Sequence, residues 1–148
     1  MALLNSVIKW INIKRIYQIQ LYWEHPIEIQ NETLFSLINS AKNTEWGKGH
    51  DYEKISTVHD FQQALPLQNY NDIKDDVDRL RNGEKDLLWP GEVKWFAKSS
   101  GTTSSKSKFI PVTKESLEDC HLRGPKDVFA QYINNYPETK VLKGKTLT

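Results

Sequence analysis

The hydroxyl-rich run from Ser99 to Lys108 contains the residue types best suited to chemistry in this sequence. Residues Ser99 to Ser105 supply six hydroxyl side chains and one glycine, and lysines follow at positions 106 and 108. Hydroxyl groups, the backbone N–H groups of a glycine-containing loop and ammonium groups are all donors, and such donors together bind polyanions. The run therefore predicts a phosphate-binding loop.

The charge around this run is positive although the whole chain is nearly neutral. Twenty basic and nineteen acidic side chains leave a formal net charge of +1, which provides no general field for nucleic acid or an anionic membrane. From Lys94 to Lys114, by contrast, there are five lysines and no acidic residue. A local cationic patch thus surrounds the predicted loop.

The glycine content of the loop excludes two common nucleotide-binding motifs. A Walker A loop needs a second glycine directly before lysine and Ser/Thr, whereas Gly101 is followed by hydroxyl residues up to Lys106. A dinucleotide fingerprint needs several glycines. A flexible serine-rich linker is the structural alternative. Predicted strands at Val93–Lys98 and Phe109–Val112 argue against a linker, because they flank the run on both sides.

Most of the remaining sequence has the three- and four-residue apolar spacing of helices. The first helix is rich in aromatic residues, and we expect it to pack against the rest of a protein rather than a membrane. Asn43 to Gly49 is expected to end the second helix, and Gly124–Pro125 to kink or divide the last one. The predicted helices are Ala2–Trp23, Pro26–Ala41, a short helix capped by Thr57, Asn71–Asn82 with Gly83 as its C-terminal cap, and 113–136 capped by Thr113.

No other cluster predicts a catalytic or metal site. Cys120 and His121 are adjacent and project about 100° apart on a helix, so we expect core packing rather than a nucleophile and its base. The acids between Asp72 and Asp78 lack the glycine of a calcium loop and are expected to form a solvated helix face. The other three histidines lack ligand spacing as well; these are His25, His50 and His59.

The Ser-Ser-Gly-Thr-Thr motif followed by lysine resembles the phosphate loop of the adenylating superfamily, which includes acyl-CoA synthetases, peptide-synthetase adenylation domains and firefly luciferase. Lys108 comes seven residues after Gly101, one later than in most of that superfamily. With further landmarks upstream, the chain is similar to the auxin-responsive-promoter (Gretchen Hagen) acyl acid amido synthetase family, as a bacterial-type member. These landmarks are Thr44-Glu45-Trp46-Gly47, Phe61, Leu65-Pro66, Tyr70, Arg81-Asn82-Gly83-Glu84 and Trp89-Pro90.

The resemblance implies an α/β fold, of which this chain is the N-terminal, mainly helical portion of an adenylate-forming, luciferase-like large domain. Residues 1–148 would be one part of a single adenylating domain, with helices over 1–90, a strand, phosphate loop and strand over 92–113, and a helix over 113–136. Family members run to several hundred residues. We therefore expect the remainder of this domain and a C-terminal domain to be missing.

The resemblance also implies the reaction and its site residues. A carboxylic acid would attack ATP, accompanied by Mg²⁺, and an amine or amino acid would then take the acyl group to form an amide. Ser99, Ser100, Gly101, Thr102 and Thr103 would hold the nucleotide phosphates. Either Lys106 or Lys108 would neutralise charge as pyrophosphate departs.

The location and the rival functions follow from simpler features. A single cysteine and the absence of a signal peptide or membrane-spanning stretch predict a cytoplasmic protein. Aromatic residues near the basic loop, among them Trp89, Trp95 and Phe96, leave open a nucleic-acid-binding module, although Trp95 and Phe96 are expected to be buried on a strand. A helical partner-binding module is the other alternative. Nucleic acid and membrane are not expected partners, and the sequence does not determine the oligomeric state.

Overall fold

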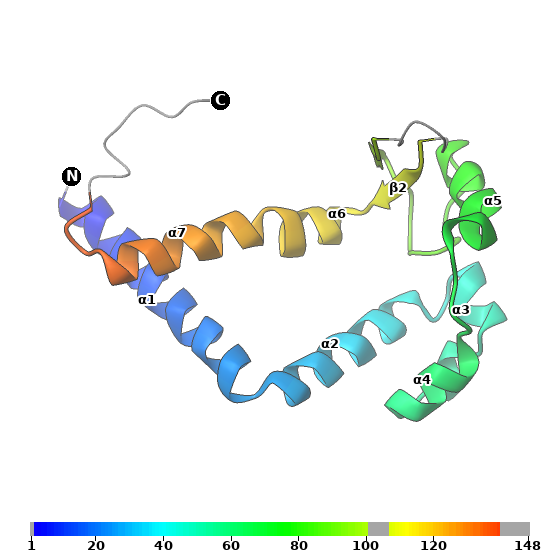
Figure 1. Cartoon of the computed structure of the whole chain (residues 1–148), viewed down its shortest axis with the longest axis horizontal. Coiled ribbons are helices and arrows are strands. Elements are labelled where there is room, and N and C mark those ends of the chain that lie inside the picture. Colours follow the sequence, from blue (N-terminus) through cyan, green and yellow to red (C-terminus); the bar gives the residue numbers. More distant parts are fainter. Residues whose placement is uncertain (1, 101–106, 140–148) are drawn as a thin grey trace. The chain divides into compact units, whose positions relative to one another are not determined.

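A computed structural model describes residues 2–100 and 107–139 and shows helices with one small sheet (Figure 1). The chain divides into a terminal unit, residues 1–26 with 118–148, and a loop unit, residues 27–117. The elements are α1 Ala2–Glu24, α2 Pro26–Ala41, α3 Glu45–Gly49, the 3₁₀ turn η1 Tyr52–Lys54, α4 Val58–Ala64, α5 Tyr70–Arg81, β1 Trp95–Lys98, β2 Phe109–Val112, α6 Lys114–Ser116, the π turn η2 Leu117–His121 and α7 Arg123–Asn135.

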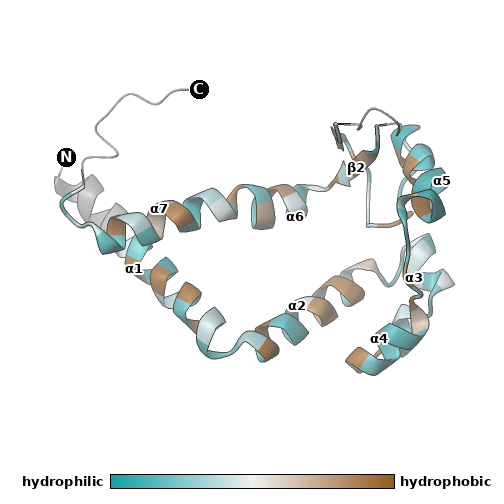
Figure 2. Cartoon of the chain, in the orientation of Figure 1, coloured by the Kyte–Doolittle hydropathy of each residue, from teal (hydrophilic) through white to brown (hydrophobic). Residues whose placement is uncertain are grey.

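In the terminal unit, α1 packs against α7. The Arg15 guanidinium donates two hydrogen bonds to the Asp127 carboxylate, at 2.6 and 2.7 Å, and Asn12 Nδ2 donates to the Ala130 carbonyl at 3.2 Å. Ile19 and Ala130 are buried there. Hydrophobic and hydrophilic residues both occur along these helices (Figure 2). The expected packing of the first helix is therefore only partial, because Trp10, Ile13 and Trp23 remain exposed.

In the loop unit, a short helix begins where the sequence predicted only the end of the second helix. The buried Thr44 hydroxyl donates to the Ala41 carbonyl at 2.7 Å and accepts the Gly47 N–H at 3.0 Å, so it caps α3. A Cβ at Gly47 would lie 2.2 Å from the Ala41 carbonyl oxygen. The glycine therefore permits the close approach of α3 to the end of α2.

The predicted cap at the start of α4, Thr57, and the predicted glycine after the end of α5, Gly83, are confirmed. Thr57 and Asp60 form a reciprocal capping box, in which hydrogen bonds from the Ser56 and Thr57 backbones and hydroxyls lower the pKa of Asp60 to about 2. Asn69 caps the start of α5 in the same way, although this cap was not predicted. After α5, Gly83 takes a left-handed φ of 89°, which a glycine adopts without strain.

The loop unit has a small core in the segment between α5 and the sheet. Leu80, Leu87 and Val93 are buried together, with Leu88 and Phe96 packed against them. The start of α3 is tied to the same segment, because the Glu45 N–H donates to the Asp86 carbonyl at 2.8 Å and the Trp46 N–H donates to the Leu87 carbonyl at 3.0 Å. The helical stretch expected up to residue 90 thus ends at Arg81, and a non-helical segment completes the core.

The Arg79 guanidinium joins α5 to this frame through three carboxylates. It makes two 2.8 Å hydrogen bonds to Glu45, two hydrogen bonds of 2.6 and 2.9 Å to Glu84, and one of 3.3 Å to Asp76. Asp76 belongs to α5, so the acids of this helix do not all face water freely as expected. The hydrogen bonds from Arg79 hold the pKa values of Glu45 and Glu84 below their usual range.

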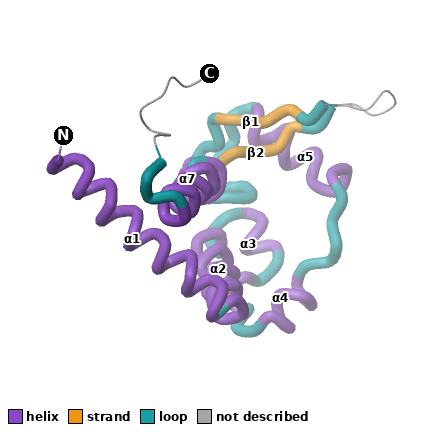
Figure 3. The backbone as a smooth tube through the Cα atoms, turned by 60° about the vertical axis from the view of Figure 1, so that its left-hand side comes forward, coloured by secondary structure: helices purple, strands orange, loops and turns teal. Residues whose placement is uncertain are grey.

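The two strands pair as an antiparallel hairpin, side by side in Figure 3. Trp95 lies opposite Val112, and Lys98 lies opposite Phe109. The second strand matches its predicted bounds, whereas the first begins at Trp95 rather than Val93, since the residue opposite Lys94 would be Thr113, which caps α6. Trp95 is 51% exposed, so the expectation that this residue is buried on the strand is wrong.

Two further expectations about the last helical region are corrected. Thr113 caps α6 as predicted, accepting the Ser116 N–H at 3.1 Å, but the helix is divided by η2, upstream of Gly124–Pro125. Pro125 instead lies in the first turn of α7, where no intrahelical N–H is needed. Cys120 is exposed on η2, so it is not a core residue.

The described part of the chain is mostly helical, with this single two-stranded sheet. The expected mainly helical character and the strands beside the loop are therefore observed, whereas the α/β class of a whole domain is not shown by these residues. Within residues 2–100 and 107–139 no helix combines the length and apolar character that a membrane span requires. The same residues contain no group of acids, histidines and cysteines that could hold a metal ion.

Candidate phosphate-loop site

The hairpin holds together the two ends of the predicted phosphate loop. The Ser99 N–H donates to the Lys108 carbonyl at 2.9 Å, and the Lys108 N–H donates to Ser99 Oγ at 3.0 Å. The first of these bonds extends the backbone ladder one residue beyond β1 and β2, and the second joins the same pair through the Ser99 side chain. Strands therefore flank the run on both sides as predicted, and Ser99 and Lys108 lie opposite each other at the end of the hairpin.

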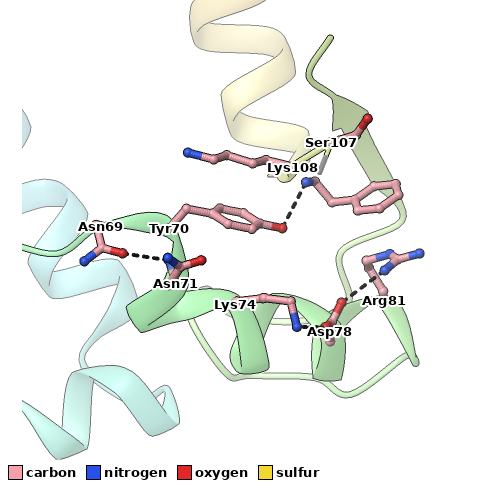
Figure 4. A pocket seen from close by; sticks show the side chains of 9 residues that line it. Asn69, Tyr70, Asn71, Lys74, Asp78, Arg81, Ser107 and Lys108 are labelled. Carbon is pink, nitrogen blue, oxygen red and sulfur yellow. Dashed lines mark hydrogen bonds and ion pairs between the residues drawn. The ribbon is translucent and has the colours of Figure 1, made fainter. Parts of the chain in front are cut away.

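Helix α5 contacts the start of β2 through Tyr70, its first residue. The Phe109 N–H donates to the Tyr70 hydroxyl at 3.0 Å, and the Lys108 ammonium lies 5.4 Å from the centroid of the Tyr70 ring. Figure 4 shows the ring between α5 and the hairpin, with its hydroxyl directed at the strand. A cation within about 6 Å of an aromatic ring face is attracted by it.

The far end of α5 contacts the same strand residue. The Arg81 guanidinium lies 3.7 Å from the centroid of the Phe109 ring, which is a close stack. Its charge is balanced by Asp78, whose carboxylate is 3.0 Å from Arg81 and 3.3 Å from the Lys74 ammonium. These hydrogen bonds, first from Lys74 and then from Arg81, lower the pKa of Asp78. Phe109 is thus contacted by both ends of one helix.

A pocket of about 780 Å³ lies between α5 and the hairpin. Its lining residues are Asn69, Tyr70, Asn71, Lys74, Asp78, Arg81, Ser107, Lys108 and Phe109. Two of its three cations pair with Asp78, whereas no carboxylate of the described residues pairs with Lys108. Lys108 therefore offers this pocket a positive charge that is free to meet an anion.

Of the residues predicted for the site, the structure describes three. Ser99 is half-buried at the neck of the hairpin, while Ser100 and Lys108 are exposed. Ser99 Oγ accepts the Lys108 N–H, so this side chain also helps to close the hairpin. The other predicted residues lie outside the described part of the chain; these are Gly101, Thr102, Thr103 and Lys106.

No role was predicted for Tyr70 or Arg81 from the sequence, although both residues are landmarks of the resemblance. In the structure, several of those landmarks make contacts that join elements of the loop unit. Thr44 and Gly47 form the α2–α3 junction, and Glu84 pairs with Arg79. The available signal was the resemblance itself, since contacts across dozens of residues leave no local pattern.

Comparison with known proteins shows the family of the chain. A model of the GH3 family N-terminal domain matches residues 15–148. The chain is 26% identical over 108 residues to indole-3-acetic acid-amido synthetase GH3.2 of Arabidopsis thaliana, covering 72% of this chain and 20% of that protein. It is 32% identical over 92 residues to GH3.15 of the same plant, covering 62% of this chain and 15% of that synthetase.

A synthetase of jasmonoyl amino acids is also among the relatives. The chain is 27% identical over 92 residues to the jasmonoyl–L-amino acid synthetase JAR6 of Nicotiana attenuata, covering 62% of this chain and 16% of that protein. The chain thus spans about a fifth or less of the length of these relatives. Since the family model covers nearly all of its residues, the chain belongs to the GH3 family, in the region of the N-terminal domain.

Proposed function

We propose that this chain is the N-terminal part of an ATP-dependent acyl acid amido synthetase and that it carries the loop that binds the ATP phosphates. The observation that carries the proposal is the Lys108 ammonium, which pairs with no carboxylate of the described residues and lies at the neck of a hairpin next to a run rich in hydroxyl donors. Membership of the GH3 family supports it, because the relatives are named as amido synthetases of indole-3-acetic acid or synthetases of jasmonoyl amino acids.

The proposed chemistry has two steps. A carboxylate oxygen of the acid forms a bond to the α-phosphorus of ATP, and the bond from that phosphorus to the β-bridging oxygen breaks, which releases pyrophosphate. An amine nitrogen then attacks the acyl carbon, AMP leaves, and the nitrogen loses a proton. The first step concentrates negative charge on the departing pyrophosphate, and a fixed ammonium group stabilises that charge.

The residues at the hairpin fit a polyphosphate. Ser99 Oγ accepts the Lys108 N–H and keeps its own hydroxyl proton to donate, and Ser100 is exposed beside it. With them, Gly101, Thr102 and Thr103 would hold the phosphates, and Lys106 would share the charge neutralisation with Lys108. Mg²⁺ would enter with ATP, since it is commonly bound through substrate phosphates and a few carboxylates.

Exchange of pyrophosphate into ATP tests the proposal in the full-length protein. The exchange should depend on an added carboxylic acid, for which indole-3-acetic acid and jasmonic acid are the first probes because the relatives' names include them. Lys108→Gln and, separately, Thr102→Ala should each lower the exchange rate by about 100-fold. Lys54→Gln is the control, because Lys54 pairs with Asp51 on an exposed turn.

Two results would contradict the proposal in different ways. Unchanged exchange in both loop variants would remove the loop from the chemistry. Amide formation from ATP, acid and amine by residues 1–148 alone would contradict the proposed division, in which the rest of the adenylating domain and a C-terminal domain supply the adenine, acyl and amine sites.

The exposure of Trp95 is one observation that favours a nucleic-acid-binding module. Exposed aromatic rings beside a basic loop stack on the bases of single strands. Oligonucleotide binding that weakens steeply with salt, in a protein that does not bind Mg²⁺–ATP, would favour this alternative. Binding of Mg²⁺–ATP that Lys108→Gln weakens would favour the synthetase.

A further inference from the structure

The outer edge of β2 has one backbone donor directly after Lys108. In an antiparallel ladder, hydrogen-bonded and non-hydrogen-bonded pairs alternate, and the bond from the Ser99 N–H to the Lys108 carbonyl places that pair in the first class. Positions 109 and 111 therefore turn their backbone nitrogens away from β1. Residue 111 is a proline and has no N–H, so Phe109 supplies the donor at this part of the edge.

Tyr70 satisfies that donor and contacts the lysine side chain with the same aromatic ring. Its hydroxyl accepts the Phe109 N–H at 3.0 Å, and its ring centroid is 5.4 Å from the Lys108 ammonium. The hydroxyl thus fixes the backbone just after Lys108, while Ser99 fixes the backbone of Lys108 itself from the other side. The lysine is held without being neutralised, because a tyrosine ring carries no formal charge.

Helix α5 is a firm base for this contact. Asn69 and Asp72 cap its start, one residue before Tyr70, and Arg79 ties its last turn to Glu45 and Glu84. Arg81, its last residue, stacks on the Phe109 ring. A helix capped and paired in this way holds Tyr70 and Arg81 at a fixed separation, so β2 cannot slide along α5 without losing both contacts.

We propose that Tyr70 is a positioning residue that holds the Lys108 ammonium where it meets the phosphates of ATP. The proposal rests on the proposed function, because it assigns the held lysine to the phosphates. An ammonium group that is already in place stabilises departing pyrophosphate without first paying for its own reorganisation. Tyr70 exchanges no proton with the substrate in this scheme and acts only through Lys108.

A double-mutant cycle in the full-length protein tests whether Tyr70 acts through Lys108. The measured quantities are the dissociation constants of Mg²⁺–ATP and Mg²⁺–pyrophosphate by calorimetry. Tyr70→Phe keeps the ring and removes the hydroxyl, and it should weaken binding by about 3- to 10-fold, as expected for one hydrogen bond. Lys108→Gln should weaken binding more, by about 10- to 100-fold.

The double variant decides between positioning and general structural damage. If Tyr70 acts through Lys108, adding Tyr70→Phe to Lys108→Gln should change the dissociation constants by less than about 2-fold. Multiplied effects would overturn the proposal. Tyr52→Phe is the matched control, because Tyr52 is another half-buried tyrosine of the loop unit that lies in the η1 turn. It should leave both constants unchanged.

A measurement without nucleotide separates the failure of this proposal from the failure of the proposed function. In protein labelled with ¹³C-lysine, the Lys108 ε-methylene protons should show an upfield ring-current shift from Tyr70, assigned by its absence in Lys108→Gln. Tyr70→Leu should abolish the shift. A missing shift in the wild type would overturn the positioning contact even where Mg²⁺–ATP binds. A normal ring-current shift in a protein that binds neither Mg²⁺–ATP nor Mg²⁺–pyrophosphate would overturn the proposed function and, with it, the role assigned to Tyr70.

Discussion

The loop unit and the terminal unit differ in how their elements are held. In the loop unit, a buried cap, a close glycine contact, a three-carboxylate network and a small core join consecutive elements. In the terminal unit, α1 and α7 share one bidentate ion pair and few buried residues, and several large apolar side chains stay exposed. Most of the contacts that fix one element against another therefore lie in the loop unit, which also carries the two strands that flank the predicted phosphate loop.

The largest expected effect follows from removing a core side chain of the loop unit. Leu80 is 1% exposed and packs with Leu87 and Val93, so Leu80→Ala should lower the free energy of unfolding by about 3 kcal/mol. Ile13→Ala in α1 is the comparison, because Ile13 is 62% exposed and should cost less than about 0.5 kcal/mol. Urea denaturation measures both; equal losses would remove the distinction between the units.

A smaller effect tests the α2–α3 junction. Gly47→Ala would bring a Cβ within 2.2 Å of the Ala41 carbonyl oxygen, so the backbone must shift, at a cost of about 2 kcal/mol. Gly49→Ala is a matched control in the same helix, because nothing lies within 4 Å of its added Cβ. Thermal unfolding of the two variants should therefore separate them, and a Gly47→Ala variant as stable as Gly49→Ala would contradict the close approach.

The stability of the terminal unit should depend on the ion pair between Arg15 and Asp127. Asp127→Asn removes the charge that the Arg15 guanidinium binds at 2.6 and 2.7 Å in a half-buried setting, and the loss should be about 1–2 kcal/mol. Amide hydrogen exchange should show faster exchange in α1 and α7 with little change in α5. Faster exchange in α5 to the same degree would show that the two units do not behave separately.

The smallest expected effect is a dependence on pH in the loop unit. Hydrogen bonds from Arg79 lower the pKa values of Glu45 and Glu84 from an ordinary value of 4.5. A depressed carboxyl pKa contributes stability above that ordinary value, and the contribution is lost as the pH falls through the folded-state pKa. Arg79→Gln should therefore destabilise the protein at pH 7 and progressively less below about pH 4.5.

Urea denaturation at pH 7 and pH 3.5 measures this dependence. Lys54→Gln is the control, because it removes one positive charge from an exposed pair with Asp51. Its effect should be slight at both pH values. A difference between the wild type and Arg79→Gln that stays the same at pH 3.5 would contradict the assignment of these two carboxylates to Arg79.

Much of the local structure was readable from the sequence because its signals are local. Thr57 and Asp60 are three residues apart, as are Thr113 and Ser116, and both caps form as predicted. The second strand was predicted with its observed bounds, since Phe109–Val112 follows a polar run and ends before a cap. By contrast α3 was missed, because five residues with two glycines carry too little periodicity to indicate a helix.

The candidate site divides in the same way. Its donors were predicted from residue types alone, and of these residues Ser99 and Lys108 lie opposite each other at the neck of the hairpin. The expected burial of Trp95 and Cys120 was wrong, because apolar character does not reveal which face of a short element finds a partner. The lysine support was also missed, since Tyr70 is 39 residues from Phe109 along the chain.

Local residue patterns were enough to predict most of the helices, the caps at Thr57 and Thr113, and the second strand, because each depends on residues within a turn or two of one another. By contrast, the approach of Gly47 to Ala41, the bond from Arg79 to Glu45 across 34 residues and the contact of Tyr70 with the strand after Lys108 are visible only in the folded chain. Those contacts need the chain to return on itself. Their geometry depends on the packing of α5 against its neighbours, which no local pattern of residues specifies.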